Sequence, residues 1–280
     1  STNIFHPYGL AVDSSGSLYV NNNGYNMTKY DSSGNFLSSS TGISAYGIAV
    51  DSSGNIYVSD TSSHTIRKIT PTGAVSTIAG LAGYNGSADG TGSTARLNSP
   101  QGVAVDSSGT YVYVADTNSS TIRRITTSTG AVSTIAGLAN SAAITDDYGT
   151  NARFYTPGGI AVDPSGNLYI TDTSGQVIRK MTLSTGYVST VAGYPYSIGS
   201  INNYGVNARF FNPRGIAIDS SGTYVYIGDT GNNTIRVLTI SINYVSTLAG
   251  LAGYNGSTDS TGSLARFKNP YGVEIGRAHV

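Results

Sequence analysis

The sequence predicts an all-β protein built from repeated four-stranded blades of a β-propeller. One phrase returns five times along the chain, as YGLAVDSSGSLYV from Tyr8, YGIAVDSSGNIYV from Tyr46, and in related form from Gln101, Gly158 and Arg214. Val, Ile, Tyr and Thr, which favour strands, alternate with runs of Gly, Ser, Asn and Asp, which favour turns, and no stretch has helical periodicity. Self-similarity of this kind is the signature of a repeat protein.

Each repeat contains four candidate strands in a fixed order. In the second repeat these are GIAVD, IYVSD, TIRKIT and AVSTIAG, and the turn SSGN joins the first two. The Asp before that turn can cap its own backbone, and the Gly can take a positive φ. We expect one domain over residues 1–273, with blades that start near residues 6, 44, 99, 156, 212 and 269. The chain therefore holds five blades and the first strand of a sixth, and the complete ring is expected to have six.

The repeats resemble the NHL-repeat family. The resemblance rests on the pattern P-x-G-[IV]-A-V-D-x-x-G-x-[IL]-Y-V-x-D-T followed by I-R-K-I, and it covers almost the whole chain. From Ser44 onward the repeats also resemble a bacterial subtype with a long segment between blades, such as GSADGTGSTARLNSP before Gln101. The first repeat departs from this pattern, because it lacks the long segment and carries NNNGYNMTKY in place of SDTSSHTIRKI. The third strand of this repeat therefore lacks the I-R-K-I pattern.

Residues 274–280 break the repeat. After NPYGV the pattern demands Ala-Val-Asp, but the chain reads EIGRAHV, and Glu274 is the only Glu of the sequence. These residues match translated sequencing-adapter DNA, so we interpret them as a non-native tail. The alternative is a natural but divergent last strand, since terminal repeats often depart from the consensus.

Composition excludes several classes of function. The 15 basic and 15 acidic residues balance, only 11% of residues are charged, and no basic patch stands out. Nucleic acid and anionic membranes are therefore not expected as partners, and no apolar run is long enough to insert into a membrane. The absence of Cys excludes disulfides, thiolate catalysis and Cys-ligated metals.

Most charged residues occupy repeat positions. The Asp of each Asp-Thr pair and the Arg of the third strand flank one hairpin loop, as Asp60 with Arg67, Asp116 with Arg123, Asp172 with Arg179, and Asp229 with Arg236. We predict that these are structural ion pairs within each blade, because repeat positions usually serve packing. The alternative is a ring of charges that binds a ligand.

The long segments carry one acid each and invite a second hypothesis. Asp89, Asp146 and Asp259, with Asn202 at the equivalent place, could suggest calcium, but a calcium ion takes six to eight oxygens, several of them from one loop. We interpret these residues as turn caps. The histidines His6, His64 and His279 are scattered, so the His-ligated metal that the NHL resemblance implies for peptide-amidating lyases cannot be built here. We expect no catalytic residue, no cofactor and no metal.

Strand direction places the variable loops on one face of the blades. Because strands in a blade alternate, the loop after the second strand and the long segment after the fourth lie on the same face, where a rigid scaffold usually carries its binding residues. Tyr84 and Tyr254, in AGYNGS, are the candidate exposed binding aromatics. The same face carries five candidate glycosylation sites, or sequons that arose by chance in Asn-rich loops, at Asn26, Asn85, Asn118, Asn232 and Asn255.

We therefore expect a non-catalytic, secreted or cell-surface protein that binds a partner or serves as a structural scaffold. The partner is a protein or a carbohydrate, and self-assembly into a filament, as one module of a larger glycoprotein, is a further expectation. The alternative is a hydrolase or lyase of the lactonase-like propeller type, because a fold alone does not exclude catalysis.

Overall fold

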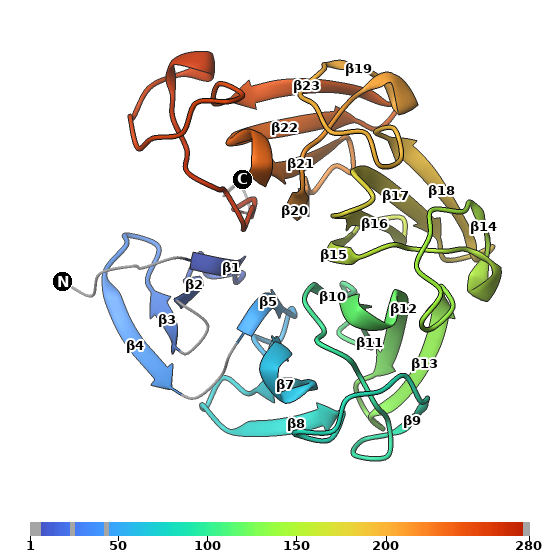
Figure 1. Cartoon of the computed structure of the whole chain (residues 1–280). Coiled ribbons are helices and arrows are strands. Elements are labelled where there is room, and N and C mark those ends of the chain that lie inside the picture. Colours follow the sequence, from blue (N-terminus) through green and yellow to red (C-terminus); the bar gives the residue numbers. More distant parts are fainter. Residues whose placement is uncertain (1–6, 23–25, 42–44, 277–280) are drawn as a thin grey trace. The chain divides into compact units, whose positions relative to one another are not determined.

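The computed structural model describes residues 7–22, 26–41 and 45–276 (Figure 1). These residues form five antiparallel sheets, each with four strands in sequence order, and three of the sheets gain a short fifth strand. The five predicted blades are confirmed, while a sixth blade is not present among the described residues. The chain divides into two compact units, Ser1–Ile135 with Glu274–Val280 and Ala136–Val273.

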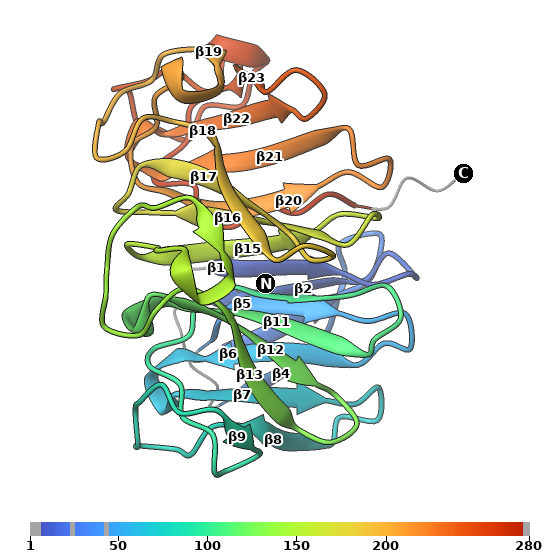
Figure 2. The same cartoon turned by 90° about the vertical axis from the view of Figure 1, so that its right-hand side faces the viewer.

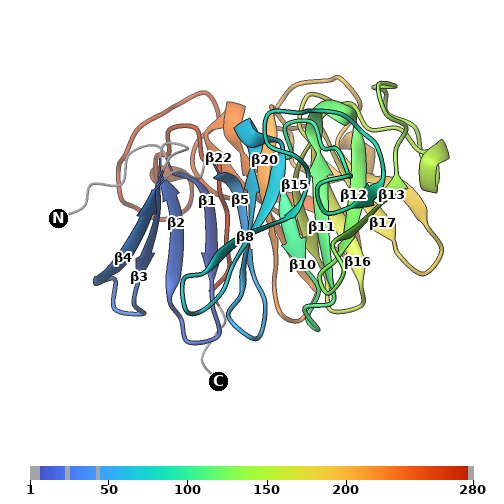
Figure 3. The ribbon, with the colours of Figure 1, turned by 90° about the horizontal axis from the view of Figure 1, so that it is seen from below.

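Unit 1 contains the first three blades. Blade 1 consists of β1 (Pro7–Val12), β2 (Leu18–Asn22), β3 (Asn26–Tyr30) and β4 (Phe36–Thr41). Blade 2 consists of β5 (Ala45–Val50), β6 (Ile56–Asp60), η1 (Thr61–Ser63), β7 (Thr65–Ile69) and β8 (Val75–Ala79). Blade 3 consists of β10 (Val103–Val105), β11 (Tyr111–Asp116), η2 (Thr117–Ser119), β12 (Thr121–Thr126) and β13 (Ala131–Ala136), and gains β9 (Gly90–Thr91). Figure 3 shows β1, β2 and β5 side by side.

Unit 2 contains two further blades of the same design (Figure 2). Blade 4 consists of β15 (Pro157–Val162), β16 (Asn167–Asp172), β17 (Val177–Thr182) and β18 (Tyr187–Ala192), and gains β14 (Asp147–Tyr148). Blade 5 consists of β20 (Pro213–Ile218), β21 (Tyr224–Asp229), η5 (Thr230–Asn232), β22 (Thr234–Thr239) and β23 (Tyr244–Ala249), and gains β19 (Asn203–Tyr204). The remaining turns are η3 (Gly149–Asn151), η4 (Gly205–Asn207) and η6 (Gly262–Leu264).

The DSSG turn forms as the sequence predicts. In blade 1, Asp13 Oδ1 accepts hydrogen bonds from the backbone N–H groups of Ser15 at 3.0 Å and Ser17 at 2.8 Å. Gly16 takes a φ of 79°, which side-chain-bearing residues avoid. The first repeat also completes its blade, because β3 pairs with both β2 and β4 despite its divergent sequence.

The recurrent Gly of the first strand is required where neighbouring blades meet. A Cβ on Gly9 would lie 2.5 Å from the carbonyl oxygen of Tyr46, the residue before the equivalent Gly of the next blade. The same approach joins Gly47 to Gln101 in unit 1 and Gly159 to Arg214 in unit 2. Any larger residue would force the first strands of adjacent blades apart.

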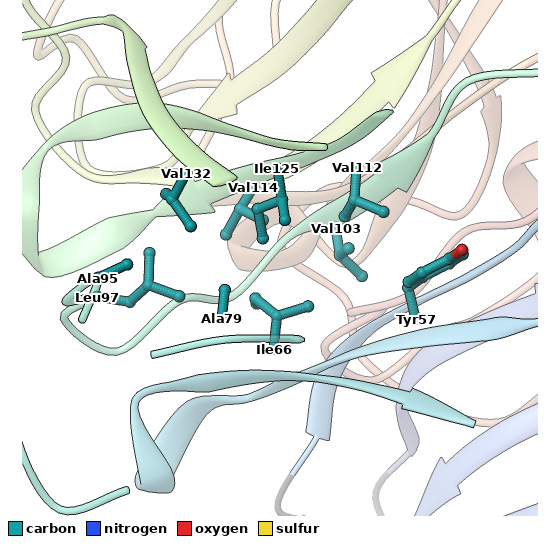
Figure 4. Close-up of a cluster of buried hydrophobic side chains, with 10 residues drawn as sticks. All are labelled: Tyr57, Ile66, Ala79, Ala95, Leu97, Val103, Val112, Val114, Ile125 and Val132. Carbon is teal, nitrogen blue, oxygen red and sulfur yellow. The ribbon is translucent and has the colours of Figure 1, made fainter. Parts of the chain in front are cut away.

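Apolar side chains between adjacent blades form the cores of each unit. Between blades 2 and 3, Tyr57, Ile66 and Ala79 face residues of β10 to β13, and Ala95 and Leu97 of the long segment complete the cluster (Figure 4). The cluster between blades 4 and 5 has the same plan, with Ala208 and Phe210 from the long segment. The Ala-Arg-Phe/Leu motif recurs because its first and third side chains fill this space. A fully buried Leu or Phe side chain contributes about 1.5–3 kcal/mol.

The long segments are not free loops throughout. Their central residues form β9, β14 and β19, and each pairs with the fourth strand of the blade that follows it. A Gly then joins two blades through its backbone. In unit 2, Gly205 accepts a hydrogen bond from Gly193 N–H at 3.1 Å, after blade 4, and donates its own N–H to Asn243 of blade 5 at 2.7 Å. Its φ of 48° explains why Gly recurs at this bridging position.

Candidate functional site

The four predicted Asp–Arg pairs come together across their hairpins. The distance between the carboxylate and the guanidinium is 3.0 Å for Asp116 with Arg123 and 2.8 Å for Asp229 with Arg236. Asp172 lies 3.8 Å from Arg179. All six side chains are fully buried. The structure therefore brings these residues together at interior positions, where they are not available to a ligand.

The fourth pair differs from the other three. Asp60 lies 3.4 Å from Arg67, and the Arg67 side chain remains 28% exposed. Blade 2 is preceded by a short linker in place of a long segment, so no segment covers this arginine as it does in blades 3 to 5. Asp60 and Arg67 thus form a weaker, partly solvated version of the same pair.

Each fully buried arginine has a second side-chain partner that comes from the long segment. Arg123 Nη2 donates to Asp89 Oδ1 at 2.7 Å, Arg179 Nη2 to Asp146 Oδ1 at 3.0 Å, and Arg236 Nη2 to Asn202 Oδ1 at 2.8 Å. The interpretation of these three residues as turn caps is therefore wrong. They accept hydrogen bonds from residues more than thirty positions away, and this contact depends on the path of the segment rather than on local sequence.

The same arginines also hold the segment by its backbone. Arg123 donates to the carbonyl oxygens of Arg96 at 3.0 Å and Ala88 at 3.1 Å, and Arg236 donates to those of Arg209 at 3.0 Å and Ile201 at 3.1 Å. A guanidinium keeps its charge when buried and has five donors to satisfy. We call this set of contacts around Arg123, Arg179 and Arg236 the arginine network.

The Asp-Thr pair also connects its blade to the preceding long segment and to the next blade. Asp116 Oδ1 accepts the N–H of Asn98 at 2.6 Å, which fixes the end of the preceding long segment. The following Thr donates its hydroxyl to the Pro that begins the next blade, at 2.6 Å from Thr61 to Pro100 and at 2.9 Å from Thr173 to Pro213. These polar groups are therefore occupied in holding the blades together.

Burial dominates the electrostatics of the network. Loss of hydration raises the pKa of Asp116 and of Asp172 to about 6, although the neighbouring guanidinium and backbone N–H groups oppose the rise. Burial also raises the pKa of Asp229. In the DSSG turns the balance is reversed, since hydrogen bonds from Ser221, Tyr224 and Thr223 outweigh desolvation and lower the pKa of Asp219.

Tyr84 and Tyr254, the candidate binding aromatics, are 63% and 62% exposed. Tyr84 closes a turn whose Gly83 N–H donates to Ser63 of η1 at 3.3 Å, so this segment lies beside the loop after the second strand. Sequence reasoning missed further exposed tyrosines in unit 2. Tyr155 and Tyr196 form an edge-to-face pair with ring centroids 5.5 Å apart. The sequence signal for Tyr84 and Tyr254 is the segment AGYNGS, which occurs twice. Tyr155 and Tyr196 flank blade 4 alone, so no repeated motif marks them.

The sequons divide into two groups. The side chains of Asn26, Asn85, Asn118 and Asn255 are exposed. The structure corrects the prediction of Asn232 as a glycosylation site, because its side chain is buried. Its amide nitrogen donates to Gly199 O at 2.6 Å and to Asp229 Oδ2 at 2.7 Å. A glycan on that nitrogen would replace one of its two hydrogens and so break at least one of these bonds at a buried position. Glycosylation at the other four sites stays a prediction.

His64 is the one histidine among the described residues, and it has a structural hydrogen-bond partner. His64 Nδ1 accepts the backbone N–H of Ser99 at 3.0 Å, while His6 and His279 lie outside the described residues. Within residues 7–22, 26–41 and 45–276, no group of three or more His, Cys, Asp or Glu side chains is placed to hold a metal ion. Nor does this part of the chain contain a helix long and apolar enough to cross a bilayer.

Repeated four-stranded blades joined through buried arginines define this chain as a repeat protein of the β-propeller class. The family model of the NHL repeat matches residues 46–69 and 154–180, so the chain contains repeats of the NHL type. The NHL repeat-containing protein 2 of Bos taurus is 31% identical over 156 residues. That match covers 52% of this chain and 22% of the bovine protein, so the chain spans about a fifth of its relative.

Solved structures share the fold at lower sequence identity. A Bacteroides thetaiotaomicron protein of unknown function superposes with a TM-score of 0.77 at 20% identity, over 99% of this chain and 66% of that one. An auxiliary nutrient binding protein from Bacteroides ovatus gives 0.67 at 20% identity, over 88% and 60%. A streptogramin B lyase gives 0.62 at 15% identity, over 92% and 72%. At these identities the likeness concerns the fold alone.

Replacing Asp116 with Ala is expected to lower the free energy of unfolding by about 1–3 kcal/mol, because it leaves one N–H of the buried Arg123 guanidinium without its acceptor while Asp89 remains as the counter-ion. The same replacement at Asp60 is expected to cost about 1 kcal/mol or less, since Arg67 can turn to solvent. Chemical denaturation of the two variants measures the difference. Equal losses, or no loss at Asp116, would contradict a structural role for the pair.

The raised pKa of Asp172 predicts a pH dependence with a definite sign. The folded state holds the proton up to about pH 6 and the unfolded state only to about pH 4, so folding is favoured below the unfolded pKa and loses this advantage as the pH rises through 6. Relative to Asp172→Asn, the wild type should lose at most about 3 kcal/mol between pH 4 and pH 7. Urea denaturation over that range measures it.

Asp219→Asn is the matched control for that titration. Because the pKa of Asp219 is lowered, its contribution to stability should be present above the unfolded pKa and disappear as the pH falls. The account of burial at Asp172 is wrong if both variants change with pH in the same direction.

Proposed function

We propose that this protein is a non-catalytic binding or structural scaffold that works outside the cell or at its surface. Its interaction face is the one that carries the long segments and the loops after the second strands. The partner is a protein or a carbohydrate. The NHL-type repeats support the general class, and the likeness to an auxiliary nutrient binding protein from Bacteroides ovatus supports a binding role.

One observation carries the proposal: the charged repeat residues are occupied in the interior, whereas exposed aromatic rings gather on the long segments. Asp116, Arg123 and their equivalents hold blades and segments together. Tyr84, Tyr196 and Tyr254 instead expose more than half of their surface, and such rings bind sugars and apolar protein surfaces at little entropic cost. Because Arg123 and Arg236 bind the segments that carry Tyr84 and Tyr196, these two rings are held on a rigid support.

The aromatic rings of Tyr84 and Tyr254 predict a measurable effect on binding. In a screen of immobilised glycans and surface proteins, any partner of the wild type should bind the Tyr84→Ala, Tyr254→Ala double variant at least about tenfold more weakly, which is 1.4 kcal/mol. The melting temperature should not change, since both rings are largely exposed.

Tyr224→Ala is the control, because Tyr224 is 40% exposed beside a DSSG turn, at the other end of the blade. Equal loss of binding in the control would place the interaction on a different surface. Loss in neither variant would refute the role of the long-segment face.

The alternative function is that of a lactonase-like hydrolase or a lyase. The fold that the chain shares with the streptogramin B lyase supports this alternative. At 15% identity, the likeness identifies no catalytic residue in this chain. Turnover of cyclic esters or lactones by the purified protein would favour the alternative over the binding scaffold.

A further inference from the structure

Blade 2 has the same positions for receiving a long segment as blades 3 to 5, although no long segment precedes it. In blade 4, Arg179 lies opposite Thr190, and both bind the carboxylate of Asp146. Arg179 Nη2 donates to Asp146 Oδ1 at 3.0 Å, and the hydroxyl and backbone N–H of Thr190 donate to the two carboxylate oxygens at 2.9 Å each. In blade 2, Arg67 lies opposite Thr77 in the same register. Blade 2 therefore carries both residues that bind a carboxylate in blade 4.

These two residues are only partly used within blade 2. Among the described residues, the Arg67 guanidinium donates to Asp60 alone, at 3.4 Å, and the Arg67 side chain is partly exposed. Thr77 is exposed, whereas Thr134 and Thr190, which each bind the carboxylate of a long segment, are partly buried. Arg67 and Thr77 can therefore bind a carboxylate that comes from outside the blade.

The fourth strand of blade 2 is uncovered in the same place. Val132, Val188 and Val245 lie two residues before the receiving Thr, are buried, and each pair with a residue of the short strand that a long segment adds. The equivalent Val75 is 44% exposed, and β8 has no strand on its outer side among the described residues. The edge of β8 can therefore pair with an added strand, and Val75 offers it an apolar contact.

The turn before β8 offers a further acceptor. In blades 3 and 4, the carbonyl groups of Gly130 and Gly186 accept the N–H of a bridging Gly at 2.9 and 2.8 Å. At the equivalent Gly73, no backbone N–H group of the described residues donates to the carbonyl. A Cβ on Gly73 would meet no atom within 4 Å, whereas one on Gly130 would lie 2.8 Å from Ile78 O. The space beside Gly73 is therefore open.

Asp60 adds a buried polar atom to this region. Its side chain is 2% exposed, and its Oδ1 has no hydrogen-bond partner among the described residues. In blade 3, Asp116 Oδ1 accepts the N–H of Asn98, at the end of the long segment, at 2.6 Å. In blade 5, Asp229 Oδ1 accepts the N–H of Phe211 at 2.8 Å. A buried carboxylate oxygen without a donor costs free energy, so a segment that supplies an N–H to Asp60 gains stability there.

We propose that Arg67, Gly73, Val75 and Thr77 line a docking groove, the blade 2 groove, which binds an extended acidic peptide of another protein. The carboxylate of the peptide binds Arg67 and Thr77, and its backbone pairs with β8 in antiparallel orientation. The inference rests on the proposed binding function and names its partner. A neutral carbohydrate offers no counter-charge to Arg67 and no strand to β8.

The long segments define the sequence that the blade 2 groove recognises. In each, the acid or Asn is followed three residues later by the bridging Gly, as Asp89 by Gly92, Asp146 by Gly149 and Asn202 by Gly205. The two residues between them form the short added strand. The Gly is required because its φ is positive, 55° at Gly92. The peptide that fits the groove therefore carries Asp-x-x-Gly.

Blade 2 is the one described blade that combines the arginine with the lack of a preceding long segment. Blades 3 to 5 bind their own segments, as shown by the contacts of Arg123, Arg179 and Arg236. In blade 1, Thr28 lies opposite Val20 where Arg67 lies opposite Val58, so blade 1 has no arginine at this position. The blade 2 groove lies within unit 1, and one peptide should bind each chain.

The probe for the test is a fluorescent peptide with the sequence of residues 85–96, which contains Asp89 and Gly92. Its binding to the full chain is measured by fluorescence anisotropy. The Asp89→Ala peptide should bind at least about tenfold more weakly, because it lacks the carboxylate. The Asp89→Asn peptide should lose less, since Asn202 binds Arg236 at the same position in blade 5.

Two variants of the full chain test the groove itself. Arg67→Ala removes the charge, and Val75→Glu places a carboxylate in the groove while leaving the Asp60–Arg67 pair intact. Each should weaken binding of the Asp89 peptide at least about tenfold. Lys68→Ala is the charge-matched control, because Lys68 lies on the opposite face of β7, over the ring of Tyr57 at 5.7 Å, and it should bind as the wild type does.

Amide hydrogen exchange gives a readout at the groove. In the wild type, bound peptide should slow exchange of the Thr77 amide at least about tenfold, because that N–H donates to the carboxylate as Thr190 N–H does to Asp146. Exchange of the Thr190 amide, which already has its acceptor, should not change.

Four outcomes overturn the proposal. The first is that the Asp89 peptide does not bind, or binds no better than the Asp89→Ala peptide. The second is normal binding to both Arg67→Ala and Val75→Glu. The third is a dimer of the wild type, detected by light scattering and lost in both variants, because a second copy would then fill the groove. The fourth is binding of polygalacturonate, but not of the peptide, that depends on Arg67, because the ligand would then be an acidic carbohydrate.

The Tyr84→Ala, Tyr254→Ala variant separates this inference from the proposed function. It should bind the Asp89 peptide as the wild type does, because neither tyrosine lines the blade 2 groove. If the peptide fails to bind while a partner from the screen still requires the two tyrosines, the groove is refuted and the binding scaffold stands.

Discussion

The path of the long segments in this structure depends on three fully buried guanidinium groups. Arg123, Arg179 and Arg236 cannot give up their charge, so each must find enough acceptors inside the protein. One carboxylate at the end of the second strand is not sufficient for five donors. Further acceptors for the Nη groups come from the long segment, and for Arg123 they are two backbone carbonyls and the Asp89 side chain. The Nε of each of the three arginines has no hydrogen-bond partner among the described residues. The arginine thereby fixes the path of a segment that contains little regular structure of its own.

This requirement links sequence, packing and function. A segment held by the arginine can place Ala95 and Leu97, or Ala208 and Phe210, between two blades, and it can add a short strand to the outer edge of the next one. The tyrosines it carries then stand on a rigid support, which reduces the entropy lost when they bind a partner. Where no long segment precedes the blade, in blade 2, the arginine is partly exposed and the fourth strand β8 gains no fifth strand beside it.

The blades and the Asp–Arg pairs were predictable because both are local. The four strands follow from alternating patterns, and Asp116 meets Arg123 because one hairpin brings them together. Asp89 contacts Arg123 only because the long segment folds back over the blade. Sequence spacing does not show this contact, and it led to the incorrect prediction that Asp89 caps a turn. Asn232 carries a sequon like the exposed sites, and only its contact with Asp229 reveals that its amide is buried.

Hydrogen exchange on an Arg179→Met variant tests the central claim most directly. Met fills much of the same apolar space but donates no hydrogen bond, so residues around β14 should lose protection while β16 and β17 keep theirs. Arg153→Met is the control, because the Arg153 side chain bonds only to carbonyls of its own turn, those of Thr150, Asn151 and Ala152. If the Arg179 variant keeps its segment protected, or the control loses as much, the buried arginines do not organise the segments.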